Sequence, residues 1–316
     1  MTLDSLRLLS VSLKSSLALI FPNKITFSEK VSTILIAGGS EYNPRKFLDV
    51  INDFPRNIQI PFSGLAASGP SLVKHDNSII MECFKLENGS LKHHSTLNFG
   101  GRRGTSIATN SVTFTFGGDY TDSSYEYLPK NSTTWILGTN IIPGGINEAC
   151  GIAINSDQEI LLIGNRYADL NRKILKFNVK DHTFEELPTK LIHGRAGARC
   201  AYLPGNKKII ITGGLNLTMR SKGMSSAEIF DIEDNSITMA PNSMNVGRSY
   251  HGIGVLTVDD QDRLAVFGGK NESGDLDSVE LLDPKTLQWE ISDMKLNGKR
   301  ADFGFLSVKY EDICKL

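Results

Sequence analysis

The chain has 316 residues, of which 40% are hydrophobic and 22% are charged, and its formal net charge is -1. This is the composition of a soluble folded protein, and the length allows two ordinary domains or one large all-β domain. A net charge near zero excludes a general electrostatic attraction to nucleic acid or to an anionic membrane surface.

The first predicted segment is an apolar stretch over residues 6–21, which Arg7 and Lys14 interrupt. It is too short and too broken to span a bilayer. Ser16 and Ala18 fit the small residues of a signal-peptide cleavage site, so a signal peptide and an N-terminal extension both stay open. We favour the extension over residues 1–30, and with it a cytoplasmic rather than a secreted location. Four N-x-S/T sequons do not settle the compartment: Asn88, Asn131, Asn216 and Asn271.

From residue 31 onward, an apolar strand that ends in two glycines recurs along the chain. It ends at Gly38-Gly39, Gly117-Gly118, Gly213-Gly214 and Gly268-Gly269, with Gly164-Asn165 as a variant. The first glycines are 79, 47, 49 and 55 residues apart, so the first interval has room for two units. Within it, residues 83–97 parallel residues 176–191. Residues 70–75 then take the place of the glycine strand, with Lys74-His75 instead of the glycines. The pattern predicts six units.

The residue pattern within each unit predicts four short strands separated by turn residues. The first strand begins at or after a basic residue, the second ends on the glycines, and the fourth carries a bulky apolar residue. These apolar residues are Leu91, Trp135, Phe184, Ile237 and Trp289. The arrangement resembles the Kelch repeat of β-propellers over residues 31–310. The resemblance implies an all-β, six-bladed propeller of Kelch-type blades, followed by a tail over residues 311–316.

The two ends of the repeat region complement each other. Unit one lacks a first strand, and residues 300–308 form a first strand with no unit after it. We therefore expect this C-terminal strand to complete blade one, which would remove exposed edges. We expect structural roles for the glycines at turns where backbones approach closely, and for two tryptophans: Gly38, Gly39, Gly117, Gly118, Gly213, Gly214, Gly268, Gly269, Trp135 and Trp289.

The cysteines and histidines give no catalytic or metal set. None of the four cysteines lies in a CxxC pair or at zinc spacing. Cys150 and Cys200 both lie six residues after a glycine, at a place where other repeats carry isoleucine, so we interpret them as core thiols and not as a disulfide. His93 and His94 are adjacent on a strand and point to opposite faces. The sequence therefore predicts no metal, no cofactor and no enzymatic activity.

Arginines dominate one predicted face of the propeller. Nine of the thirteen lie in the loops or strand starts of this face. Two alternatives stay open: pairing with acids of their own loops, or an arginine-lined channel mouth for an acidic partner. The predicted partner-binding set is Arg102, Arg103, Arg166, Arg195, Arg220, Arg248 and Arg300.

We therefore predict a monomeric, non-enzymatic protein-interaction scaffold that binds an acidic protein or peptide, with no nucleic acid and no membrane span. The Kelch resemblance suggests actin as a partner, although no residue argues for it. Alternatives are a secreted glycan- or matrix-binding propeller and a sugar-modifying enzyme. The resemblance includes the Kelch sialic-acid mutarotases, which would need a carboxylate and an arginine in the channel mouth, and Glu148 lies near a first strand.

Overall fold

The computed structural model describes seven strands between residues 32 and 93, residue 97, and residues 103–309 apart from 120, 206 and 218–222. Side chains are described at residue 97 and over the later range as far as residue 307. The predicted N-terminal extension and Gly38-Gly39 therefore lie outside the described residues. Within the described part, no helix is long and apolar enough to cross a membrane.

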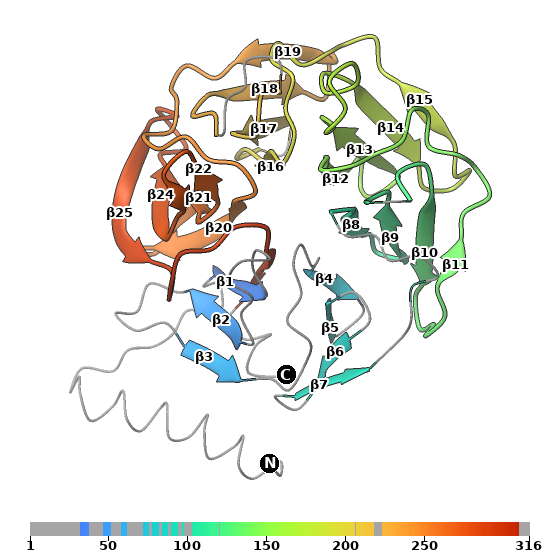
Figure 1. Cartoon of the computed structure of the whole chain (residues 1–316), viewed down its shortest axis with the longest axis horizontal. Coiled ribbons are helices and arrows are strands. Elements are labelled where there is room, and N and C mark those ends of the chain that lie inside the picture. The colour runs from blue at the N-terminus through green and yellow to red at the C-terminus, as the bar shows by residue number, and fades with distance from the viewer. Residues whose placement is uncertain are drawn as a thin grey trace.

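The described strands form six antiparallel four-stranded sheets, arranged around a common centre in Figure 1. The innermost strands are β26 (Gly304–Lys309), β4 (Leu72–His75), β8 (Thr105–Ala108), β12 (Cys150–Ile154), β16 (Arg199–Tyr202) and β20 (Gly252–Val258). The second strands are β1 (Ser32–Ala37), β5 (Ser78–Met81), β9 (Val112–Phe116), β13 (Glu159–Ile163), β17 (Lys208–Thr212) and β21 (Gln261–Phe267).

The third and fourth strands complete each sheet toward the outside. The third strands are β2 (Phe47–Ile51), β6 (Phe84–Glu87), β10 (Tyr125–Pro129), β14 (Ile174–Asn178), β18 (Ala227–Asp231) and β24 (Ser278–Leu282). The outer strands are β3 (Ile58–Pro61), β7 (Ser90–His93), β11 (Ile136–Leu137), β15 (Phe184–Glu186), β19 (Ser236–Met239) and β25 (Trp289–Lys295). A small hairpin, β22 (Lys270–Asn271) and β23 (Gly274–Asp275), follows β21. The predicted all-β propeller class is confirmed.

The C-terminal strand lies beside the first strand of the chain. β26 pairs antiparallel with β1 from Ser32↔Lys309 to Ala37↔Gly304, so the first sheet combines both ends of the repeat region. This is the pairing that the sequence pattern predicts. That this pairing seals the propeller against edge-to-edge association stays a prediction.

The structure corrects the interpretation of residues 70–75. They contain β4, which is the innermost strand of its sheet, and β5 is the second strand. Lys74 and His75 therefore do not replace the diglycine, because they end a first strand. The parallel between residues 83–97 and 176–191 holds, since both provide a third and a fourth strand.

The diglycines lie where each sheet meets the next. Gly117 and Gly213 have left-handed φ angles of 61° and 60°. A Cβ at Gly117 would lie 2.0 Å from the carbonyl oxygen of Ile146, and one at Gly213 would lie 2.3 Å from that of Arg248. In each pair the second glycine donates its N–H to that same carbonyl. Only glycine permits both the dihedral angle and the close approach.

The hydrophobic core lies between neighbouring sheets. In β13, Ile160 and Leu162 belong to a core cluster with residues of β9 and β14. Leu161 and Ile163 belong to a second cluster, with residues of β17. Alternate side chains of one strand thus reach both faces, as expected for a strand buried on both sides. Trp135 and Trp289 are buried in the core, as predicted.

Candidate functional site

Five residues with left-handed backbone angles precede five innermost strands. Their φ values are 64° at Arg103, 59° at Glu148, 60° at Gly197, 51° at Tyr250 and 54° at Asp302. Each lies two residues before its strand, β8, β12, β16, β20 or β26. We call these five the belt residues.

Backbone hydrogen bonds link the belt residues from sheet to sheet. The N–H groups of Glu148, Gly197, Tyr250 and Asp302 each donate to the carbonyl of the preceding belt residue, at 2.8 to 3.0 Å. Four of the five are not glycine, and the left-handed region costs such residues about 1–2 kcal/mol each. Backbone strain of this kind gathers at binding and catalytic sites, so the belt is the first candidate for function.

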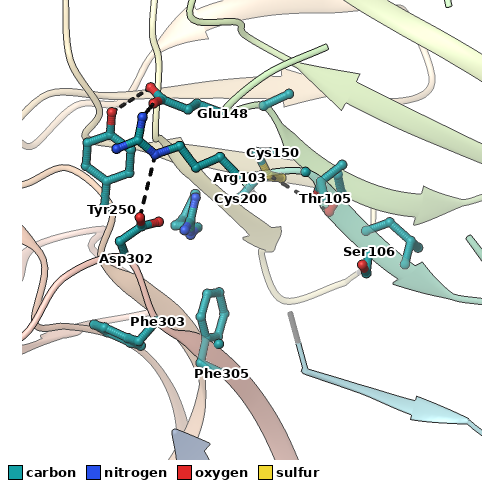
Figure 2. A pocket seen from close by; sticks show the side chains of 16 residues that line it. Arg103, Thr105, Ser106, Glu148, Cys150, Cys200, Tyr250, Asp302, Phe303 and Phe305 are labelled. Atoms are coloured by element: carbon teal, nitrogen blue, oxygen red, sulfur yellow. Dashed lines mark hydrogen bonds and ion pairs between the residues drawn. A yellow bond between two sulfur atoms is a disulfide. The ribbon is translucent and has the colours of Figure 1, made fainter. Parts of the chain in front are cut away.

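The Glu148 carboxylate is the centre of the polar contacts at the belt. Its side chain is 1% exposed, and Oε1 lies 3.1 Å from Nη1 of Arg103 and 3.2 Å from Nη1 of Arg166. Its other oxygen, Oε2, accepts a hydrogen bond from the Tyr250 hydroxyl at 2.5 Å. Figure 2 shows the side chains of Arg103, Glu148 and Tyr250 converging from different sheets. All the oxygens of Glu148 thus have partners, which makes it an organising residue.

Tyr250 is fixed on several sides. Burial, and then the Glu148 carboxylate, raise the pKa of its phenol well above the usual value, so the hydroxyl keeps its proton and donates it. The Lys270 ammonium lies 4.5 Å from the ring centroid. A Cβ at Gly197 would come within 2.8 Å of the Tyr250 ring, so the one belt residue without a side chain leaves room for the tyrosine.

Asp302 and Arg199 have fewer polar side-chain contacts than Glu148. Oδ2 of Asp302 lies 3.7 Å from Nε of Arg103, beyond hydrogen-bond distance. The Arg199 guanidinium donates to the carbonyl of Ala198 and lies 5.8 Å from the centroid of the Phe305 ring. Among the described residues, no carboxylate lies within 4.0 Å of it. Burial lowers the pKa of Arg199, and nearby acids, Asp302 foremost, oppose this.

These side chains line a cavity of ≈ 200 Å³. Arg103, Glu148, Arg199, Tyr250 and Asp302 form its polar part, and Ile107, Phe303 and Phe305 contribute apolar surface. A cation without a carboxylate partner beside a weakly bound carboxylate suits a small ligand that has an anionic group and hydroxyl groups. Within the described residues, no group of three or more His, Cys, Asp or Glu side chains is placed to hold a metal ion.

Two predicted core thiols form a disulfide instead, between Cys150 and Cys200. The comparison of repeats that places the two cysteines at equivalent positions is out of register by one residue. Counted from the belt residues, Cys150 lies two positions after Glu148, whereas Cys200 lies three positions after Gly197. Side chains two and three positions along a strand point to opposite faces, and neighbouring propeller sheets turn opposite faces toward each other. The shift therefore allows the two sulfurs to meet.

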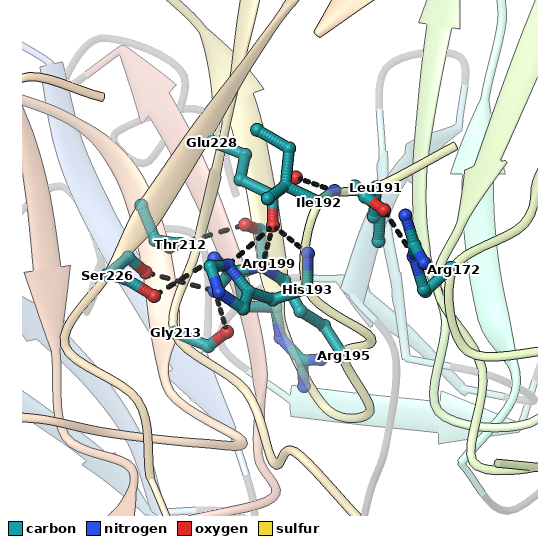
Figure 3. A network of polar contacts seen from close by, with 10 residues as sticks. All are labelled: Arg172, Leu191, Ile192, His193, Arg195, Arg199, Thr212, Gly213, Ser226 and Glu228. Carbon is teal, nitrogen blue, oxygen red and sulfur yellow. Dashed lines mark hydrogen bonds and ion pairs between the residues drawn. The ribbon is translucent and has the colours of Figure 1, made fainter. Parts of the chain in front are cut away.

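The structure also corrects the predicted arginine-lined mouth. Arg195, Arg248 and Arg300 are fully buried, with 0% exposed surface. Nε of Arg195 pairs with Glu228 at 3.0 Å, and its guanidinium donates to carbonyls of its own sheet, as Figure 3 shows. Arg248 pairs in the same way with Glu280, at 2.7 Å. Arg195 and Arg248 hold strands together, and none of the three buried arginines can meet a partner from solvent.

The rest of the predicted partner-binding set divides in two. Arg103 and Arg166 lie at the belt and pair with Glu148. Arg102 and Arg220 lie outside the described residues. The sequence reasoning did not identify Arg199, Tyr250 and Asp302 as site residues. The belt positions carry five different residue types, so the repeat alignment gives no shared side chain that would reveal them.

Comparisons with known proteins identify the architecture. No protein-family model and no curated protein matches the sequence. Among solved structures, the chain is similar to the one entitled "Structure of YjhT", with a TM-score of 0.53 and 17% sequence identity. The match covers 64% of this chain and 68% of that chain. At this identity, the likeness shows the propeller fold alone.

The comparison corrects one prediction about function. The sequence predicts that the chain is not an enzyme, because no catalytic set is recognisable in it. The comparison contradicts this prediction as far as the fold is concerned, because the propeller fold that the chain shares with YjhT carries enzymes as well as binding proteins. The belt shows what the sequence reasoning missed, since its polar side chains come from four separate repeats.

Proposed function

We propose that the cavity at the belt is an active site that interconverts the anomers of a sugar acid, as in a sialic acid mutarotase. The observation that carries this proposal is the pairing of a buried, organised Glu148–Arg103–Tyr250 cluster with the less engaged Asp302 and Arg199 in one cavity. Glu148 is the carboxylate that the Kelch resemblance implies, although its contacts make it a positioning residue.

Mutarotation requires one proton to move between two oxygens of the sugar. Asp302 takes the proton from the anomeric hydroxyl, and the bond between the anomeric carbon and the ring oxygen breaks with its electrons going to the ring oxygen. The protonated Asp302 returns the proton to that oxygen, which gives the open-chain ketone. Closure onto the other face of the carbonyl reverses these steps and yields the second anomer.

The cations have distinct roles in this proposal. In a sialic acid, the anomeric carbon carries a carboxylate, and the planar fork of Arg199 suits it. Arg103 lies between Glu148 and Asp302 and orients both carboxylates. Phe303 and Phe305 offer apolar surface to the face of the sugar ring that its C–H groups form.

We also propose that the repeats are of the Kelch type. The diglycines, the basic residues that open first strands and the buried Trp135 and Trp289 support this. The main function predicted from the sequence, a scaffold for an acidic protein, loses its chief support because Arg195 and Arg248 are buried. Actin and an acidic peptide as partners, and a secreted glycan-binding role, stay untested predictions.

The test starts from a single anomer of N-acetylneuraminic acid and follows its conversion by proton NMR. We expect the wild-type chain to accelerate the conversion, and Asp302→Asn to lower kcat by at least about 100-fold, because general acid–base groups contribute this much. Arg199→Gln should raise KM. Arg263→Gln, at a pair with Glu290 remote from the cavity, is the matched control and should leave both constants unchanged. A wild-type chain that does not exceed the spontaneous rate would overturn the proposal.

A further inference from the structure

The Cys150–Cys200 disulfide joins the first strands of two neighbouring sheets at the candidate site. The cysteines are 50 residues apart in sequence, and their Cα atoms are 6.0 Å apart, within the range that a disulfide spans. Both cysteines line the same cavity as Glu148 and Arg199. In Figure 2 the disulfide lies between the polar cluster and Thr105.

We propose that this disulfide is the positioning element of the cavity, which holds Glu148 and Arg199 at their working separation and makes ligand binding there depend on its oxidation state. The ligand-binding part of this inference rests on the proposed function. Cys150 lies two residues after Glu148, and Cys200 directly follows Arg199. The bond therefore fixes the two strands that carry the organising carboxylate and the anion-binding cation.

At this junction the two belt residues themselves are joined only by a backbone hydrogen bond. Between Arg103 and Glu148, an ion pair of 3.1 Å supplements the backbone hydrogen bond. Between Glu148 and Gly197, the belt has the backbone bond from Gly197 N–H to the Glu148 carbonyl, at 2.8 Å, but Gly197 has no side chain to add a second contact. The disulfide supplies here the second cross-link that the ion pair supplies between Arg103 and Glu148.

The disulfide is open to reduction from the cavity side. Cys150 is buried with 5% of its surface exposed, while Cys200 is half-buried and also lines the cavity, so we expect a reductant to attack the sulfur of Cys200. The thiolate of a dithiol attacks this sulfur, the S–S bond breaks, and Cys150 leaves as a thiolate that takes a proton. The second thiol of the reductant then displaces Cys200. The products are two cysteine thiols and one cyclic disulfide of the reductant.

Reduction should act on the site before it acts on the fold. The sheets of β12 and β16 stay packed through a core that includes Leu161, Ile163 and Ile209. Without the covalent bond, the inner strand ends are free to separate. Misplacement of a ligand-binding group by about 1 Å can cost up to about 100-fold in rate or affinity.

The first experiment measures binding and conversion of N-acetylneuraminic acid before and after treatment with dithiothreitol, well below the melting temperature. Intact mass gives the oxidation state. We expect reduction to raise KM by about 10- to 100-fold, more than it lowers kcat. Reoxidation should reverse the change, and the Cys150→Ser/Cys200→Ser variant should match the reduced chain and ignore dithiothreitol. Leu128→Ala is the control, since it destabilises a core that contains none of the residues lining the cavity and should leave KM unchanged.

The second experiment needs no ligand. Hydrogen exchange measured by mass spectrometry should show faster exchange of the Gly197 amide after reduction, with unchanged exchange in β24. If the oxidised chain binds and converts sialic acid, and reduction changes neither KM nor kcat, the positioning role is wrong and the proposed function stands. If the oxidised chain does neither, the proposed function is wrong, and the Gly197 amide decides alone: unchanged exchange overturns the inference.

Discussion

A buried ion pair inside a single sheet explains why arginines recur at the starts of first strands. Glu228 accepts hydrogen bonds from the N–H groups of Ile192 and His193 and from Nε of Arg195, and the side chains of Glu228 and Arg195 are both fully buried. The arginine thus joins the linker between two sheets to the third strand of the second sheet. A pattern of basic residues in sequence does not distinguish this role from a binding role, because burial depends on the partner strand.

Arg195→Ala should therefore destabilise the fold. Removing one partner of a buried pair leaves the Glu228 charge without compensation, which typically costs about 3–5 kcal/mol. Urea denaturation followed by fluorescence measures the loss. Arg263→Ala is the control, because Glu290 is 60% exposed and such pairs contribute about 1 kcal/mol or less. Equal losses in the two variants would show that burial of Arg195 has no energetic role.

At the scale of the strand, the sequence predicts the element types and their order but not their register at strand starts. The second strands are recognisable because their diglycines meet a neighbouring carbonyl in every described case, which is a backbone requirement. The first strands have no such shared residue. Counting from Gly144 and Gly194 placed Cys150 one position too late, and a one-residue shift moves a side chain to the other face. This shift hid the disulfide.

The pairing of β26 with β1 predicts the result of a truncation. Deletion of residues 304–316 removes every β1 partner on that side, from Ser32 to Ala37. The exposed edge should then pair with other chains, and light scattering should show oligomers or aggregates. Deletion of residues 311–316 alone is the control and should leave a monomer. A longer truncation that stays monomeric with unchanged melting would contradict a sealing role of β26.

At the scale of the whole molecule, the repeat period is enough to predict a propeller, because each unit must bury both faces against its neighbours. The candidate site is not predictable in this way. Arg103, Glu148, Tyr250 and Asp302 come from four units, and they become neighbours only when the first strands gather around the centre. The sequence indicates Glu148 as a candidate because this carboxylate lies near a first strand. The roles of Tyr250 and Asp302 depend on left-handed backbone angles, which are uncommon for residues other than glycine and less common for tyrosine than for aspartate.

The same gathering of first strands places a neutral histidine among arginines. His251 is fully buried, and its Nε2 lies 2.8 Å from the Thr212 hydroxyl oxygen. Burial first, and then the charges of Arg248, Arg199 and Arg195, lower the pKa of His251 well below its usual value. The folded state therefore binds this proton less readily than the unfolded state, and acid should weaken the propeller.

The sign and the window follow from proton linkage. Above the unfolded-state pKa of about 6.5, His251 is neutral in both states and the full stability is present. As the pH falls below this value, the unfolded state takes up the proton first, and the free energy of unfolding drops by about 1.4 kcal/mol per pH unit for this group. Urea denaturation at intervals between pH 8 and pH 5 measures this slope. His251→Gln keeps an amide near Thr212 but does not titrate, so its slope should be flatter by that amount. His182→Gln is the comparison: burial also lowers the pKa of His182, but it is only half-buried, so the change should be smaller. A His251→Gln variant with the wild-type slope would show that acid weakens the propeller elsewhere.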